Sequence, residues 1–100
     1  MAAKKAVRNP EEVRTRIFQS VAMDPELDGV DLRVFLYLGT LLNFDEPVHH
    51  SQLELALCLG RRKEHISRAI RRLTEAGILV PGPEGNRASK WRLNPDYGKE

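Results

Sequence analysis

The cationic side chains of this sequence are concentrated in one short stretch. Residues 61–72 hold six of the sixteen Lys and Arg residues beside a single Glu, a local charge of +5 on a chain whose net charge is +2. Lys and Arg donate charge-assisted hydrogen bonds to phosphate oxygens, and a basic stripe along one helix is typical of proteins that bind nucleic acids. The first chemistry that the sequence suggests is therefore contact with a polyanion.

The periodicity of this stretch predicts a helix over residues 62–76 with two different faces. The apolar face consists of Ile66, Ile70 and Leu73. The polar face consists of Arg61, His65, Arg68 and Arg72, at positions i, i+4, i+7 and i+11. A helix fits the major groove of B-DNA, where Arg can bond guanine O6 and N7. The alternative is an ordinary solvated helix face, because Lys and Arg also favour helix formation.

Different parts of the polar face are expected to make different contacts. Arg68 and His65 are the predicted base contacts, since the N-terminal half of a recognition helix usually enters the groove. Glu64 could hold Arg68 or accept a hydrogen bond from cytosine N4. The helix N-terminus attracts phosphate through the helix dipole. Three cations stand there, namely Arg61, Arg62 and Lys63.

Further contacts are predicted around this helix. Arg71 either contacts DNA or pairs with Glu75, four residues along. Ser51 and Gln52, at the start of the preceding helix, could donate to a phosphate, although Ser51 is equally explained as a helix cap. The predicted DNA-binding residues are Ser51, Gln52, Arg61, Arg62, Lys63, His65, Ser67, Arg68, Arg71, Arg72, Arg87 and Lys90.

A short helix is predicted to precede the cationic helix and to hold it in place. Ser51 and Glu54 have the spacing of a capping box, and Gly60 supplies the turn that follows. The inward face of this short helix is expected to consist of Leu53, Ala56 and Leu57. The two helices together predict a helix-turn-helix.

The first helix of the chain is predicted over residues 10–20. Asn9 can serve as its cap, Pro10 suits the first helical position, and Glu12 stands where a capping box requires an acid. A basic arm, residues 1–8, precedes this helix and is expected to be flexible or to contact phosphate.

The second helix is predicted over residues 31–43, with Asp28 as its cap. It is apolar around much of its circumference, so we expect it to be central or to be covered by a second chain. Gly39 in its interior costs about 1 kcal/mol relative to Ala. Such a glycine predicts that another element approaches closely.

Short β segments complete the predicted fold. They are Val48 with His49, residues 78–80 and residues 88–93. Turn-forming residues over 81–86 join the last two into a hairpin, with Trp91 and Leu93 facing the core. The loop at 81–90 is the predicted wing, and its Arg87 and Lys90 either reach the minor groove or its phosphates or are solvated.

The predicted fold class is mainly α with a small β-hairpin, arranged as a winged helix-turn-helix. A helix-turn-helix cannot bury its own apolar faces, so the helix at 31–43 and the sheet must close the core. A single winged-helix domain is predicted over residues 9–97, between the arm at 1–8 and a tail at 98–100.

The chain resembles the winged-helix DNA-binding superfamily over roughly residues 28–97. The resemblance is carried by Leu55-Ala56, Leu59-Gly60, Ile66-Ser67-Arg68-Ala69-Ile70, Leu73 and Ala76-Gly77-Ile78-Leu79. It is greatest to MarR-like domains and to those of RepL-type plasmid replication proteins and phage replication-O-type proteins. The long dimerisation helices of MarR regulators are missing, so a dimer would use the helix at 10–20 or the helix at 31–43. The family often has Ser or Thr where Arg62 stands.

Winged helices that bind Z-form nucleic acids are also similar, because they place a Trp in the last strand as this chain places Trp91. They usually have Tyr at the position of Arg71 and a proline pair before the Trp. Neither feature is present here, so the B-form DNA binders are the better match.

The sequence argues against several other classes of protein. His49, His50, Cys58 and His65 have no zinc-site spacing, and no catalytic set of residues stands out, so we expect no metal, no cofactor and no enzymatic activity. No apolar run reaches the ~20 residues of a membrane helix. One cysteine, expected to be packed, and no secretory leader predict a cytoplasmic protein associated with a nucleoid or plasmid.

Acidic residues are segregated from the cationic stretch. Residues 24–54 hold seven acids against one base, Arg33. One side of the molecule should therefore repel phosphate while another attracts it.

The leading hypothesis is a sequence-specific double-stranded DNA-binding protein that acts as a homodimer. It would serve plasmid-type or phage-type replication, partition or copy control, with a replication or partition protein as a further partner, or it would repress transcription. The alternative is a winged-helix module that binds an acidic protein through the same face.

Overall fold

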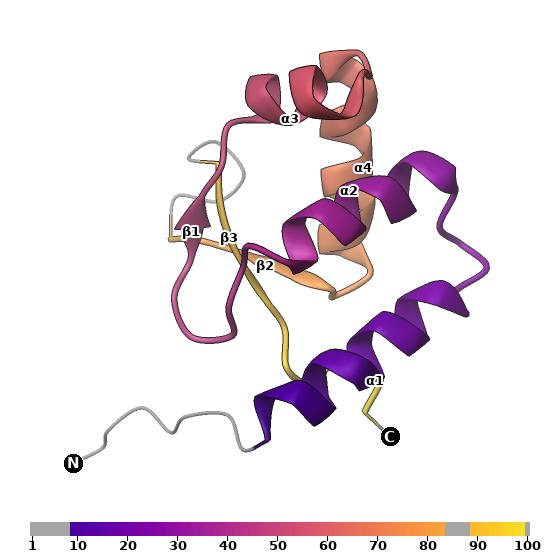
Figure 1. Cartoon of the computed structure of the whole chain (residues 1–100), viewed down its shortest axis with the longest axis vertical. Helices are drawn as coiled ribbons and strands as arrows, with labels where there is room; N and C mark the ends of the chain where they lie inside the picture. Colours follow the sequence, from indigo (N-terminus) through magenta and orange to yellow (C-terminus); the bar gives the residue numbers. More distant parts are fainter. Residues whose placement is uncertain (1–8, 84–88, 100) are drawn as a thin grey trace.

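The computed structural model describes residues 9–83 and 89–99. Over these residues it is mainly helical, with four helices and a small antiparallel sheet of three strands (Figure 1). The elements are α1 (Pro10–Ala22), α2 (Gly29–Gly39), β1 (Val48–His49), α3 (Gln52–Leu59), α4 (Lys63–Glu75), β2 (Leu79–Pro81) and β3 (Lys90–Leu93). The predicted mixture of helices and short strands is confirmed. The predicted arm at 1–8 lies outside the described residues.

The sheet contains one strand more than the predicted hairpin. Its order is β1-β3-β2, and both pairings are antiparallel. Trp91 of β3 lies opposite Val48 on one side and Pro81 on the other. The segment before α3 is therefore fixed to the sheet at β1, which also fixes where α3 begins.

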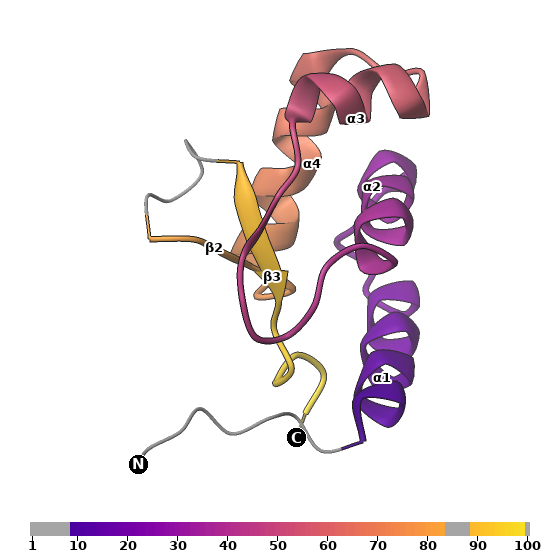
Figure 2. The ribbon, with the colours of Figure 1, turned by 60° about the vertical axis from the view of Figure 1, so that its left-hand side comes forward.

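The elements are distributed along the longest axis of the molecule. α3 and the start of α4 lie at one end, and the N-terminal end of α1 lies at the other (Figures 1 and 2). Trp91 and Leu93 of β3 are fully buried with Phe35 of α2, as predicted. Burying each such side chain contributes about 1.5–3 kcal/mol, so the sheet and α2 close the core beneath α3 and α4.

Local capping explains where two of the helices begin. At α2, Asp28 accepts a hydrogen bond from the Asp31 amide, and Asp31 accepts one from the Asp28 amide, both at 3.0 Å. At α3, Ser51 accepts from the Glu54 amide at 3.3 Å. Gly60 ends α3 with a left-handed φ of 65°, a conformation that glycine adopts without steric cost.

The predicted cap of α1 is wrong. Asn9 has a left-handed φ of 51° and its side chain makes no capping hydrogen bond. Glu12 therefore has no capping partner there. Pro10 occupies the first turn as predicted, because its missing N–H is not needed at that position.

Another element does approach Gly39 closely, as the sequence predicted. A Cβ at this residue would lie 2.8 Å from Cζ of Phe18. Arg14, also on α1, donates a hydrogen bond of 2.6 Å to the Gly39 carbonyl. α1 consequently packs directly on the backbone of α2. The second helix also ends at this glycine rather than at residue 43.

The inward face predicted for α3 is partly wrong. Ala56 is buried as expected, but the second buried residue is Leu55. Leu53 and Leu57 are 58% and 76% exposed. Cys58, which was predicted to be packed, is exposed as well. α3 is thus rotated from the predicted orientation and turns apolar side chains outward.

The residues after β3 attach the end of the described chain to α1. Arg16 donates hydrogen bonds to the carbonyls of Pro95 and Tyr97. The Tyr97 hydroxyl donates to Asp24 at 3.1 Å. Burial, followed by that hydrogen bond, raises the pKa of Tyr97 to about 12. Within residues 9–83 and 89–99, no helix has the length and apolar character needed to cross a membrane.

Candidate nucleic-acid interface

α4 has the two faces that the sequence predicted. Ile66, Ile70 and Leu73 are almost fully buried, together with Ala69. The exposed residues of the helix and of the turn before it are mainly cationic. They are Arg61, Arg62, Lys63, Glu64, His65, Arg68, Arg71 and Glu75. One face of α4 is therefore packed in the core, and the remaining exposed face is mainly cationic.

The beginning of α4 is open to an anion. Arg62 is the capping residue and its side chain makes no capping hydrogen bond. The first amides of a helix need an acceptor, and a phosphate is a suitable one because the helix dipole also attracts it. Lys63 and Arg61, both exposed, flank this end.

Three predicted contact residues are occupied in positioning the two helices. Ser67 of α4 donates a hydrogen bond of 2.5 Å to Oε1 of Gln52, at the start of α3. Ser51 accepts from the Glu54 amide and so caps α3. The bond between Ser67 and Gln52 joins α4 to the start of α3.

The prediction that Arg72 projects freely with the other cations is wrong. Its Nη1 atom donates to Asp28 at 3.0 Å and to Asp31 at 3.4 Å. The Arg72 side chain is 41% exposed, whereas that of Asp31 is only 2% exposed. Arg72 joins α4 to the first turn of α2, because a buried carboxylate such as that of Asp31 needs a charged partner.

The hydrogen bonds and charges around Asp28 and Arg72 shift the pKa values of these two residues. The hydrogen bond from the Asp31 amide lowers the pKa of Asp28, and the charge of Arg72 adds to that effect against the opposing effect of burial. The hydrogen bond to Asp31, followed by the charge of that residue, raises the pKa of Arg72. The sequence marked Asp28 only as a cap, and no local signal connects residues 28 and 31 to residue 72.

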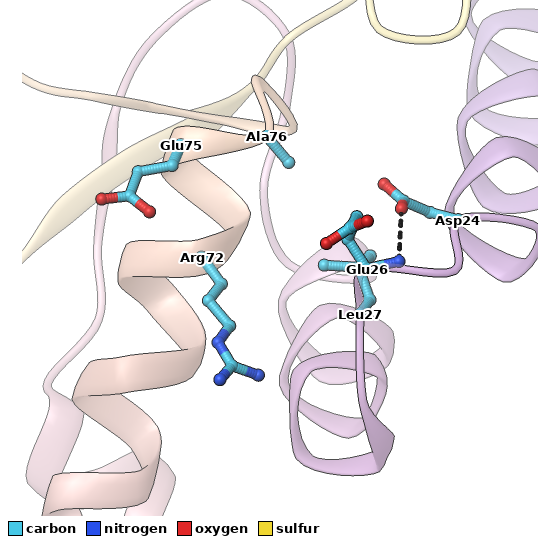
Figure 3. Close-up of a pocket in the computed structure, with 6 residues that line it drawn as sticks. All are labelled: Asp24, Glu26, Leu27, Arg72, Glu75 and Ala76. Carbon is cyan, nitrogen blue, oxygen red and sulfur yellow. Dashed lines mark hydrogen bonds between the residues drawn. The ribbon is translucent and has the colours of Figure 1, made fainter.

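Two hollows border α4 on the side of α2. The first, of about 550 Å³, is lined by Asp24, Glu26, Leu27, Arg72, Glu75 and Ala76. Figure 3 shows Arg72 extending from α4 toward the segment that carries Glu26 and Leu27, while Glu75 points away from it. The second, of about 240 Å³, is lined by Asp28, Val30, Asp31, His65 and Arg68. His65 and Arg68 therefore have carboxylates on one side.

The local ion pairs that could have occupied the other cations are not formed. Among the described residues, no ion pair joins Arg71 to Glu75 or Arg68 to Glu64. Arg71 and Arg68 both have exposed side chains. They are the two cations of the helix body that remain available to an external anion.

The predicted wing, the loop at 81–90, is described only in part. Lys90 is exposed at the start of β3, opposite His49, and this end of β3 points toward the end of the molecule that carries α3 and the start of α4 (Figures 1 and 2). Arg87, the other predicted wing cation, lies outside the described residues.

The described residues bring together no group of three His, Cys, Asp or Glu side chains that could hold a metal. Neither a family model, nor a curated protein, nor a solved structure matches this chain. The functional argument therefore depends on the exposed cations of α4 and on the elements that hold them.

Proposed function

We propose that this protein is a winged helix that binds double-stranded DNA through α4, with sequence preference and without catalytic chemistry. The order α2, β1, α3, α4, β2, β3 supports this assignment, because a helix-turn-helix followed by a hairpin is the arrangement that the winged-helix resemblance implies. The observation that carries the proposal is the exposed, unpaired cationic face of α4, which includes Arg68 and Arg71.

In this arrangement each part of the face has a role. Arg68 meets a base edge in the major groove, where a guanidinium can bond guanine O6 and N7. Arg61, Lys63 and the uncapped start of α4 hold a phosphate. Lys90 contacts the backbone beside the groove. Phosphate contacts position the helix, and the base contact supplies the preference for sequence.

The biological role that we propose is control of plasmid-type or phage-type replication, partition or copy number, or local repression of transcription, with the protein acting as a homodimer in the cytoplasm. Two copies would match a repeated half-site, because the spacing of half-sites follows the spacing of the two recognition helices. A replication or partition protein would be the further partner.

Footprinting on the DNA that flanks the coding region of this protein tests the proposal. We expect protection of a repeated sequence, and several repeats would favour replication or partition over repression. R68A is the test variant and R33A is its matched control, because each removes one positive charge and Arg33 is an exposed cation on α2, in a hollow with Leu36 and Thr40. R68A should lose the footprint and R33A should keep it.

One combination of results would contradict the proposal. A chain that protects no DNA, but binds an acidic protein in a manner abolished by R68A, would contradict DNA binding. It would assign the same face to a protein partner.

A further inference from the structure

A hollow with an apolar lining lies between α2 and α3. Its volume is about 330 Å³, and it is lined by Arg33, Leu36, Tyr37, Thr40 and Leu59. Leu36 is 55% exposed although it is a large apolar side chain. Exposed apolar surface with a polar rim is typical of a site that binds another protein.

The apolar lining continues from this hollow onto α3. The Tyr37 hydroxyl donates a hydrogen bond to Sγ of Cys58 at 3.8 Å. Cys58 is exposed, and Leu57 beside it is 76% exposed. We call Leu36, Tyr37, Leu57, Cys58 and Leu59 together the α2–α3 surface.

The α2–α3 surface lies away from the cationic helix. Asp31 is the residue of α2 that is bonded to Arg72 of α4. At about 100° per residue, Leu36 lies about 140° around α2 from Asp31. A partner seated on Leu36 would therefore contact the side of α2 that does not face α4.

The sequence left two helices open for a dimer, and α1 has no apolar face to offer. Its Ile17 and Val21 are buried in the core of the protomer. The ring of Phe18 lies 4.7 Å, centroid to centroid, from that of Phe35 on α2. No large apolar side chain of α1, which is described in full, is exposed. α2, together with α3, is the remaining choice.

Charges of both signs border the α2–α3 surface. Arg33 lines the hollow, and the exposed Glu54 lies one turn before Cys58 on α3. The hydrogen bond to Cys58 raises the pKa of Tyr37, and the negative charge of Glu54 adds to this effect. A surface with both signs is complementary to itself about a twofold axis, whereas a partner of one sign would be repelled by one of the two charges. Such rim charges orient two copies and contribute little to affinity.

We propose that a second copy of this chain docks on the α2–α3 surface, so that the homodimer forms about a twofold axis at the hollow between α2 and α3. This inference rests on the homodimer of the proposed function and names its interface. The cationic faces of both copies of α4 then remain available for DNA.

Sedimentation velocity without DNA, over a range of protein concentrations, tests the interface. L36E should weaken the dimer by about a hundredfold or more, because an unpaired carboxylate would be buried between the copies. M23E is the matched control, since Met23 is a 73% exposed apolar residue outside the surface, and it should leave the dimer unchanged. L57E repeats the test at a more exposed position, where loss of folding does not account for the result.

The native thiol gives a second measurement that needs no substitution. Cys58 is the chain's single cysteine, so its reaction with a maleimide reports on this surface alone. Its rate should fall several-fold as the wild-type chain is concentrated, because the second copy covers it. The rate in L36E should not change over the same concentrations.

The results separate this interface from DNA binding. A wild-type chain that is monomeric at every concentration, a dimer that L36E and L57E leave intact, or a dimer with Cys58 equally reactive throughout would overturn the interface. Protection of Cys58 only when another protein is present would assign the surface to that protein and overturn it as well. A dimer through this surface that gives no footprint would overturn DNA binding and leave the interface standing.

Discussion

Arg68 and Arg72 lie one helical turn apart on α4, yet their surroundings give them different chemistry. Arg68 is exposed and unpaired, whereas Arg72 is bound to Asp28 and Asp31. Sequence spacing placed both on one face correctly, because helical periodicity is a local property. Their partners depend on how α2 crosses α4, which no local pattern specifies.

Arg68→Ala is the residue-scale prediction for binding. We expect a loss of about 1–3 kcal/mol on the preferred site and a weaker preference among bases, since a bidentate contact to guanine is removed. Competition titrations with the site and with random duplex measure both quantities. An equal loss on the two DNAs would reassign Arg68 to phosphate contact.

Tyr97→Phe is the residue-scale prediction for stability. The folded protein holds the pKa of Tyr97 at about 12, above its ordinary value of 10.0. The stability that this shift provides is fully present below pH 10 and is lost as the pH rises toward 12. Urea unfolding across that range should show a smaller alkaline loss of unfolding free energy in Y97F than in the wild type. Equal losses would show that Tyr97 does not cause the effect.

At the scale of elements, the caps of α2 and α3 were predicted correctly from local sequence. Asp28 and Ser51 cap α2 and α3 as their sequence positions indicate. Asn9 does not cap α1, although its type and its Pro10 neighbour favour capping. The exposure of Leu53 and Leu57 was also missed, because the rotation of α3 is set by its contacts with α2 and α4 rather than by its own apolar residues.

Ser51→Ala tests whether capping positions α3. We expect the free energy of unfolding to fall by about 1 kcal/mol, the usual cost of removing a helix cap. Asn9→Gly is the matched control, because Asn9 makes no capping bond and has a left-handed φ that glycine tolerates. Chemical denaturation of both variants measures the two changes in the free energy of unfolding. A loss as large in N9G as in S51A would contradict the assignment of the caps.

At the scale of the whole molecule, the chain length, the hydrophobic periodicity and the charge pattern predicted a small mainly helical domain with one cationic element. The third strand was expected only as a short segment, and its pairing with β3 could not be predicted, because strand pairing joins residues far apart in the chain. The acidic and basic residues that are separated in the sequence are also separated in the folded structure. The acids of the α1–α2 segment border one edge of α4, and the exposed cations of α4 remain at the surface.

The salt dependence of binding tests the central claim most directly. If the exposed face of α4 binds duplex DNA, log affinity should fall linearly with log salt, because each phosphate contact releases counterions. Four cations at phosphates would give a slope of about −4. Affinity for duplex DNA that hardly changes with salt, or no affinity at any salt concentration, would contradict the account.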